Sequence, residues 1–421
     1  MGHAPRDHEP RGGAFARFSW MLLDWAASAF STVLITLVVT YVEKVALPEG
    51  AFGMDAGVVW SWTMAAAMFV SAVIAPWAAA WADRRDAHQR ALVAGTAVGV
   101  GGLLSLAAIA PTASIGVVTA VIAACLGFDI AQVFTGSLLP RIATGRAADR
   151  LSAAGFAAGY AGGGIALVAV TAIVTAHARF GIDIAGGLRL AFAFTAAWWL
   201  VFSLPAAVAR FGGGDGARHA SNPGRELLAF ARSLIAPPDA AVDGRFAAAL
   251  AGSMLALGAI QTAITQFTSL ALQRFDLDGP ALVRLVLLVQ AVALPGALGV
   301  GWLAARWGRR IAVTVCMAGW LLVLALAWFV RTPAELHGLA VLLALVLGGA
   351  QSVIRAAVAT LAPAGRSGVT FGLLHVGTKL AGCGAGLAFG MLQLATGNPQ
   401  TGLVALVLQL LAAWWLLRRI I

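Results

Sequence analysis

Charged residues are scarce in this chain: only 11% of its 421 residues are Asp, Glu, Lys or Arg, whereas 60% are hydrophobic. A soluble globular protein carries about 25% charged residues, so the composition excludes a soluble enzyme and a disordered chain. Twelve spanning helices of about 20 residues need about 240 apolar positions, which the hydrophobic fraction supplies. The composition predicts a helical protein that crosses the membrane many times.

Cysteine and lysine are also rare. The three cysteines, Cys125, Cys316 and Cys383, all lie in apolar stretches, so neither a disulfide framework nor a metal-binding spacing is present, and we expect no metal and no cofactor. Lysine occurs only at Lys44 and Lys379, so arginine supplies most of the net charge of +10. In a membrane protein this excess marks cytoplasmic loops, and we expect no nucleic-acid partner.

Twelve apolar stretches are bounded by charged residues, prolines or glycine clusters. They cover approximately residues 18–42, 57–81, 91–110, 113–139, 152–177, 187–209, 246–272, 281–305, 311–330, 336–361, 368–394 and 401–417. Each is long enough to cross a hydrocarbon core of about 30 Å as a helix. The first stretch lacks a small-residue cleavage site, so it predicts a span and not a removable signal peptide.

The positions of the positive charges predict the orientation. With the N-terminus inside, 21 Lys and Arg residues lie in cytoplasmic segments and six lie outside, while Lys379 falls within a span. The positive-inside rule therefore predicts that both termini are cytoplasmic. Because lysine is rare and Ala and Gly are abundant, we expect a bacterial source and hence the bacterial inner membrane.

The chain is expected to form two six-helix bundles, over residues 1–209 and 246–421, joined by a cytoplasmic linker at 210–245. The linker contains three consecutive glycines and three prolines, which are typical of loops. Within it, residues 225–235 predict a short interfacial helix with one apolar face. A disordered linker is the alternative.

The two halves repeat a loop pattern. The sequence A-A-A-W-A-D-R-R at 78–85 follows the second span, and G-W-L-A-A-R-W-G-R-R at 301–310 follows the eighth. Superposing Arg84 on Arg306 requires an offset of 222, and L-L-P at 138–140 matches L-A-P at 361–363 at an offset of 223. Two parallel six-helix repeats predict a major facilitator fold, and both loops resemble the signature G-x-x-x-D-R-x-G-R-R of the major facilitator superfamily.

Within that superfamily, several stretches are similar to the vacuole-effluxer-like branch, which is related to autophagy-associated amino-acid effluxers of yeast. They are L-D-W-A-A-S-A-F at 23–30, F-T-G-S-L-L-P at 134–140, G-Y-A-G-G at 159–163, G-G-A-Q-S-V-I-R at 348–355 and F-G-L at 371–373. The resemblance implies efflux of an amino acid or a related metabolite. The chain departs from the branch at Gly136, where the family usually has Asn, and near Gly258, where it has an acidic residue.

The loop motifs are expected to control conformation. An Asp at a helix end makes charge-assisted bonds with Arg side chains and with the N-terminus of a neighbouring helix. Asp83 and Arg84 are therefore the candidate cytoplasmic latch of the first half. The second half contributes Arg306, Arg309 and Arg310, in a weaker latch because Ala305 replaces the Asp. In the alternative interpretation, these arginines only hold their loops on the cytoplasmic side.

Ionisable side chains within spans are the stronger candidates for the transport site, because placing each at the centre of a spanning helix costs about 2.5–3.5 kcal/mol. Asp129 and Lys379 both lie about eleven residues, or about 16 Å, from the cytoplasmic end of their spans. Lys379 is expected to bind a substrate carboxylate or to exchange partners with Asp129, whose protonation would couple the cycle. The alternative is a static buried pair. Asp24 is expected to meet a basic loop side chain.

Neighbouring polar residues complete the candidate cavity. His375 precedes Lys379 by one helical turn and is a candidate proton relay, or else a packing residue. Gln261 and Gln351 lie on spans that line the central cavity in the fold that the resemblance implies. Arg355 lies one turn beyond Gln351, where it either snorkels or binds an anion.

The sequence thus predicts a monomeric secondary transporter in the lipid bilayer that moves a small, zwitterionic solute, with proton coupling or without it. Two alternatives stay open: an exporter or flippase of an amphipathic compound or lipid, and a non-transporting sensor or assembly partner on the same scaffold. No Walker-type sequence supports direct use of ATP. No catalytic metal spacing or Ser-Lys dyad favours an intramembrane enzyme, so the chain is not expected to be an enzyme.

Overall fold

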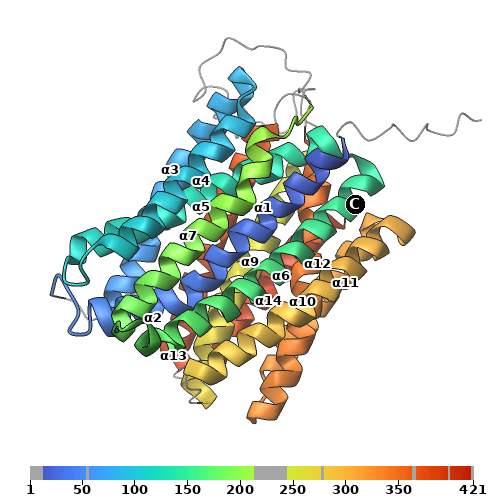
Figure 1. Cartoon of the computed structure of the whole chain (residues 1–421). Helices are drawn as coiled ribbons and strands as arrows, with labels where there is room; N and C mark the ends of the chain where they lie inside the picture. The colour runs from blue at the N-terminus through green and yellow to red at the C-terminus, as the bar shows by residue number, and fades with distance from the viewer. Residues whose placement is uncertain are drawn as a thin grey trace, which may run out of the picture.

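The computed structural model describes residues 13–53, 56–212, 244–275, 279–362, 367–396 and 399–418. The regular elements in these ranges are helices, and long helices lie side by side in one bundle (Figure 1). The predicted interfacial helix at 225–235 lies outside the described residues. The all-helical architecture predicted from the composition and the apolar stretches is confirmed for the described residues.

Six predicted spans in the first half correspond to six long helical segments. They are α1 (Ala14–Val33) with its continuation to Ala46, α3 (Ala56–Arg85), α4 (His88–Ala108), α5 (Ser114–Ile142), α6 (Gly145–Thr175) and α7 (Ile184–Val208). A short 3-10 turn, η3 (His177–Phe180), precedes α7. Asp183 begins α7 by accepting a hydrogen bond from the backbone N–H of Gly186 at 2.8 Å, which satisfies one of the free donors of the first turn.

The second half supplies six further helices. They are α9 (Gly244–Phe275), α10 (Gly279–Trp307), α11 (Arg309–Ala327), α12 (Pro333–Leu361), α13 (Ser367–Thr396) and α14 (Leu403–Leu417), which follows the short turn η4 (Pro399–Gly402). Thr332 and Glu335 form a capping box at the start of α12, with Pro333 in the first turn. The observed bounds differ from the predicted spans by a few residues at each end.

Eleven segments in the described ranges are long and apolar enough to cross a membrane. The predicted span outside this set is α13, which is 30 residues long and carries His375 and Lys379. The predicted twelfth span thus exists as a helix of spanning length.

The first span is not a uniform α-helix. After Val33 it continues as a π-helical turn, η1 (Leu34–Val38), then α2 (Val39–Tyr41) and a second π-helical turn, η2 (Val42–Ala46). The hydroxyl of Thr36 donates to the carbonyl of Thr32 at 2.7 Å, next to the first of these turns. Such π-helical insertions are rare and recur at functional sites.

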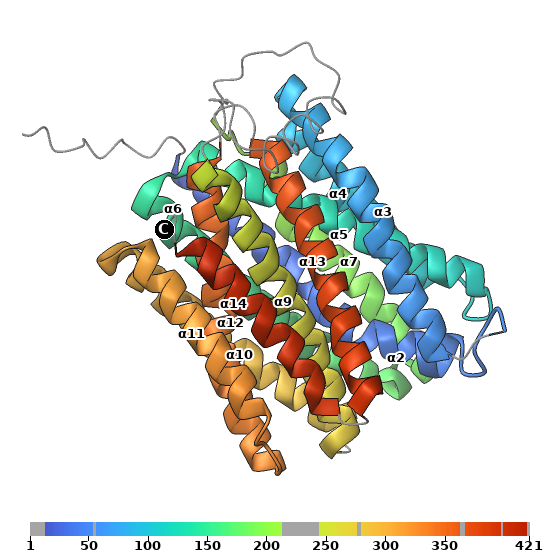
Figure 2. The same ribbon diagram turned by 180° about the vertical axis from the view of Figure 1, so that it is seen from behind.

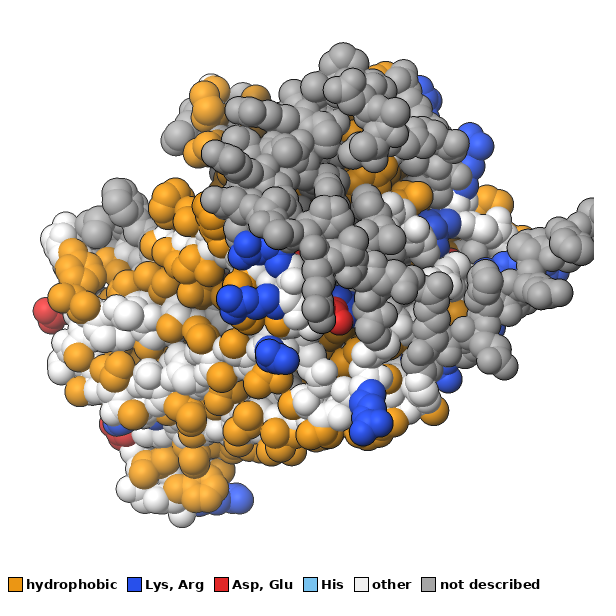
Figure 3. All heavy atoms as spheres, turned by 90° about the horizontal axis from the view of Figure 1, so that it is seen from above, with side chains coloured by type: hydrophobic (Ala, Val, Ile, Leu, Met, Phe, Trp, Pro, Cys, Tyr) orange, Lys and Arg blue, Asp and Glu red, His pale blue; other side chains and the backbone are white. Residues whose placement is uncertain are grey.

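Both ends of the described chain lie at one end of the bundle, where α1 begins and α14 ends (Figures 1 and 2). We call it the termini end. Viewed onto this end, the surface carries several Lys and Arg side chains (Figure 3). It also holds the turns between α3 and α4, between α5 and α6, and between α10 and α11.

Two apolar clusters form the core, and they follow the two halves. One joins α1 and α3 to α7, and the other joins α9 to α14. The first cluster also takes in Phe246, Leu250, Val358, Phe371 and Leu374, which belong to the second half and lie toward the termini end of their helices. The halves are therefore in apolar contact at the termini end.

Candidate functional site

The ionisable residues predicted at the middle of the bundle lie in contact. Lys379 Nζ on α13 lies 3.2 Å from Asp129 Oδ1 on α5, and the Asp129 side chain is 7% exposed. At 1.5 Å per residue, Lys379 lies about 18 Å along α13 from its start and Asp129 about 20 Å along α5 from its end. A lysine of the second half thus neutralises a carboxylate of the first half at mid-depth.

A histidine and a serine extend this pair. His375 Nε2, one turn before Lys379, lies 3.6 Å from Asp129 Oδ2 and 3.3 Å from the hydroxyl oxygen of Ser71. Ser71 belongs to α3 and is fully buried. Three helices therefore converge on the Asp129 carboxylate, which has Lys379 at one oxygen and His375 at the other. We call Ser71, Asp129, His375 and Lys379 the central cluster.

The two glycines at which the chain departs from the vacuole-effluxer-like branch both face α13. A methyl group at Gly136 would lie 2.6 Å from the ring of Phe371, and one at Gly258 would lie 2.7 Å from the backbone nitrogen of Gly382. Side chains as large as Asn or Glu do not fit these spaces, because α13 already fills them. The missing polar groups of the branch are thus replaced by close packing against the helix that carries Lys379.

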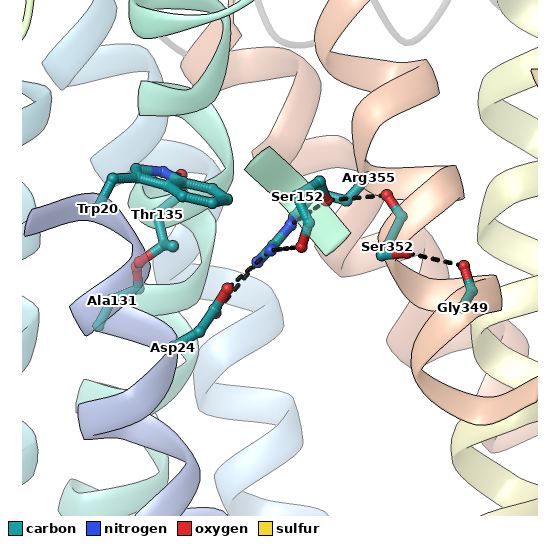
Figure 4. A network of polar contacts seen from close by, with 8 residues as sticks. All are labelled: Trp20, Asp24, Ala131, Thr135, Ser152, Gly349, Ser352 and Arg355. Carbon is teal, nitrogen blue, oxygen red and sulfur yellow. Dashed lines mark hydrogen bonds and ion pairs between the residues drawn. The ribbon is translucent and has the colours of Figure 1, made fainter. Parts of the chain in front are cut away.

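A second ion pair joins the halves nearer the termini end (Figure 4). Arg355 of α12 donates to both carboxylate oxygens of Asp24 on α1, with Nη1–Oδ1 at 3.1 Å and Nη2–Oδ2 at 2.7 Å. The same guanidinium donates from Nε to the hydroxyl of Ser152 at 3.1 Å and from Nη2 to its carbonyl at 3.1 Å. This bidentate geometry gives orientation as well as attraction.

Packing holds Arg355 in place. Its guanidinium lies 4.6 Å from the ring centre of Trp20 and 4.2 Å from that of Phe156, so that cation–π contacts add to the ion pair. Gly155 makes room for this arrangement, because a methyl group there would lie 2.6 Å from Asp24 Oδ2. The expectation that Asp24 meets a basic loop side chain is wrong. Its partner is instead an arginine within a span of the other half, which tertiary packing brings against it.

A third contact between the halves lies at the termini end itself. Arg309, the first residue of α11, donates from Nη2 and Nε to Asp149 Oδ1 of α6 at 2.9 and 3.1 Å. It also donates from Nη1 to the hydroxyl of Thr360 at 2.8 Å. Asp149 is buried. One of the arginines assigned to the second latch therefore pairs with an acidic residue of the first half that no sequence motif singles out.

The loop between α3 and α4, which carries the predicted latch of the first half, makes contacts within that half. Asp83 Oδ1 lies 2.9 Å from His88 Nε2, and His88 Nδ1 lies 2.9 Å from the Ser137 hydroxyl. These contacts tie α3, α4 and α5 of the first half together. Arg84 lies at the end of the same helix and also interacts with other residues.

The remaining predicted residues lie outside these clusters. Arg306 and Arg310 are exposed at the termini end and form no ion pair with any residue that the structure describes. Gln261 is exposed on α9 and Gln351 is half-buried on α12. Gln290 of α10, which is not among the residues predicted from sequence, donates to the Thr32 hydroxyl of α1 at 2.8 Å across the two halves.

Comparison with known proteins agrees with this architecture. The family described as "Vacuole effluxer Atg22 like" matches residues 16–420. The uncharacterized MFS-type transporter YxiO of Bacillus subtilis strain 168 is 24% identical over 400 residues, which cover 93% of this chain and 91% of that protein. The resemblance indicated by the sequence motifs is thereby confirmed.

Solved structures share the fold. The fucose:proton symporter FucP of E. coli superposes with a TM-score of 0.74 at 12% identity, over 97% of this chain and 98% of that one. The proton:xylose symporter XylE gives a TM-score of 0.69 at 14% identity, over 97% and 94%. The chain belongs to the vacuole effluxer Atg22-like family and is a multi-pass membrane transporter of the major facilitator type.

Proposed function

We propose that this protein is a secondary active exporter of an amino acid or a related zwitterionic metabolite, coupled to protons at the central cluster. The observation that carries the proposal is the contact of Lys379 with Asp129, because it places one positive and one negative group at mid-depth on different halves. Buried charges within membrane spans are costly and recur in solute and ion pathways.

A zwitterionic solute offers each of these side chains a new partner. Its carboxylate pairs with Lys379 while its ammonium group pairs with Asp129, so that neither buried charge is left without a counter-charge. The solute then separates the ion pair that joins α13 to α5. Binding thereby weakens a link between the halves, which is what alternating access about a midplane site requires.

Proton coupling uses the same residues. The imidazole of His375 lies beside both the Asp129 carboxylate and the Ser71 hydroxyl. Histidine exchanges protons near neutral pH, and a proton on the imidazole or the carboxylate changes the net charge that faces Lys379. Protonation and solute binding therefore compete for one buried charge pair, which makes exchange of one for the other possible.

The two other ion pairs are proposed to close the cytoplasmic side. The excess of arginine at the termini end supports a cytoplasmic location for both termini, in a bacterial inner membrane. The contacts of Asp24 with Arg355 and of Asp149 with Arg309 join the halves at that end. They must break when the cavity opens to the cytoplasm and re-form when the solute leaves on the other side.

The first test is a thermal-stability screen of the purified protein in detergent, with amino acids, short peptides, sugars, organic anions and lipids at two pH values. A ligand at 100 times its Kd adds about 2.7 kcal/mol to the stability of the folded state. We expect a zwitterionic compound to stabilise the wild type and to lose this effect in Lys379→Ala. Lys44→Ala is the matched control, because Lys44 is the other lysine and is exposed.

Transport is then measured in proteoliposomes with the compound found, with and without a pH gradient. A compound that stabilises Lys379→Ala as much as wild type would place recognition away from the central cluster. A lipid or amphipathic ligand that survives the substitution would favour the flippase alternative. The double variant Asp129→Lys with Lys379→Asp keeps an ion pair at this place with its charges exchanged, so we expect it to fold but not to transport. Full transport in that variant would mean that the pair is only structural.

A further inference from the structure

The first half has an apolar groove on its outer face, away from the central cluster. It is formed where α7 packs against both α1 and α4 (Figure 1). The groove is shallow and open on one side, with a cavity volume of about 70 Å³, and its lining is almost wholly apolar. The lining residues are Leu23, Leu92, Val93, Thr96, Ala97, Leu200, Ser203, Leu204 and Ala207.

The walls of this groove face the surroundings of the bundle. Val93, Leu200 and Leu204 are 42%, 44% and 52% exposed, whereas Leu23 and Leu92 form a buried floor at 3% and 1%. In a protein that crosses the membrane, an exposed apolar wall over a buried apolar floor faces the hydrocarbon chains of the bilayer. A hydrocarbon chain is therefore the kind of group that fits the groove.

The serine in the lining does not offer a hydrogen bond to a ligand. The Ser203 side chain is 8% exposed, and its hydroxyl oxygen is enclosed by the protein. The groove therefore suits a hydrocarbon chain and not a polar group.

Two arginines lie close in sequence to the residues that line the groove, at the termini end of α4 and α7. The amide of Gln89 donates to the carbonyl of Ala209 at 2.9 Å, so the backbones of α4 and of the residues after α7 are held together here. Arg90 follows Gln89 and Arg210 follows Ala209, and both side chains are exposed. Arg90 also precedes Val93 by about one turn on the same helix. Two exposed arginines therefore lie at the termini end of the helices α4 and α7, which line the groove.

We propose that this groove binds one anionic phospholipid from the leaflet at the termini end. Its phosphate pairs with Arg90 and Arg210, and one acyl chain lies in the groove over Leu23 and Leu92. The site lies on the first half alone and does not depend on the identity of the transported solute.

The test counts bound lipids by native mass spectrometry on the whole protein, with phosphatidylglycerol or phosphatidylcholine added to the detergent. We expect one phosphatidylglycerol to be retained by the wild type and phosphatidylcholine to bind much more weakly. An arginine near a phosphate contributes about fivefold to the affinity, so Arg90→Ala and Arg210→Ala should each weaken retention by about that factor. Arg146→Ala, an exposed arginine at the same end, is the control.

The groove itself is tested by Leu204→Trp, which fills it, and by Leu322→Trp, which places the same group at a position 49% exposed on α11. We expect loss of the bound lipid only in Leu204→Trp, with unchanged circular dichroism and elution volume in both variants. Equal retention in both variants would overturn the proposal, and so would equal binding of phosphatidylcholine. A dimer of the wild type that disappears in Leu204→Trp would assign the groove to a second copy of the chain instead.

Discussion

The ion pair of Asp24 with Arg355 allows a quantitative test, because each partner leaves a buried charge behind when the other is removed. The two side chains are only 4% and 11% exposed. We consider Asp24→Leu, Arg355→Met and the double variant. Each single substitution should lower the free energy of unfolding by about 3–5 kcal/mol, because breaking a buried pair strands one charge. The loss of Arg355 also removes its bonds to Ser152 and its contacts with two aromatic rings.

The double variant should recover most of this loss. Replacing a buried pair by apolar groups of similar size is often neutral or stabilising, so the coupling free energy in the cycle should exceed about 2 kcal/mol. The measurement is unfolding by titration with sodium dodecyl sulfate in a fixed nonionic detergent, with the midpoint of thermal unfolding as a second readout. Transport should stay low in the double variant, since the link between the halves is lost.

The control is a second ion pair of the same types of residue, Asp86 with Arg141. It joins two segments of the first half, and the Asp86 side chain is 51% exposed. An exposed pair contributes about 0–1 kcal/mol, so its coupling should be small. If the coupling of Asp24 with Arg355 is no larger than that of this exposed pair, the reasoning from burial is refuted.

Three further outcomes are expected. Gly127→Ala should destabilise the fold by about 1–3 kcal/mol or more, because the added methyl group collides with the backbone of α4. In the control Gly101→Ala the methyl group meets open space, so this variant should be neutral or slightly stabilising in thermal unfolding. Asp83→Asn should lower stability by about 1–3 kcal/mol and reduce transport, since it breaks a buried contact between helices; unchanged transport would leave only a topological role for this loop. Arg309→Ala should speed the alkylation of a cysteine introduced as Ser152→Cys severalfold in a cysteine-free background, and an unaltered rate would contradict a closing role for its ion pair.

Much of the fold could be predicted from the sequence, because a membrane span demands about 20 apolar residues and a fixed rise per residue. The same fixed rise places Asp129 and Lys379 at comparable depths from their positions in the sequence alone. Depth alone does not say which helices are neighbours. The contact between these two residues therefore depends on α13 packing against α5, which no periodicity of a single span encodes.

The partner of Asp24 shows most directly which contacts could not be predicted from the sequence. Arg355 and Asp24 are 331 positions apart, and each is a candidate for reasons of its own that do not point to the other. Asp149 could be noticed in the sequence only as an acidic residue between Arg146 and Arg150 at the start of a span. Ser71 could not be singled out as a site residue, since a serine within an apolar stretch is common. These residues become significant only when tertiary packing brings a counter-charge or a histidine against them.

The π-helical turns of the first span have a consequence for its evolution and for its design. A π-helical turn holds one more residue than an α-helical turn, so it typically corresponds to an insertion of a single residue. Winding the same residues between Leu34 and Val38 as a regular α-helix would rotate everything beyond them by up to about 100°. Tyr41, which is buried against the ring of Phe192 with a centroid distance of 5.2 Å, would then point away from α7 while Asp24 kept its place. The extra residue lets one helix present two independent faces, one to the partner half at Asp24 and one to its own half at Tyr41.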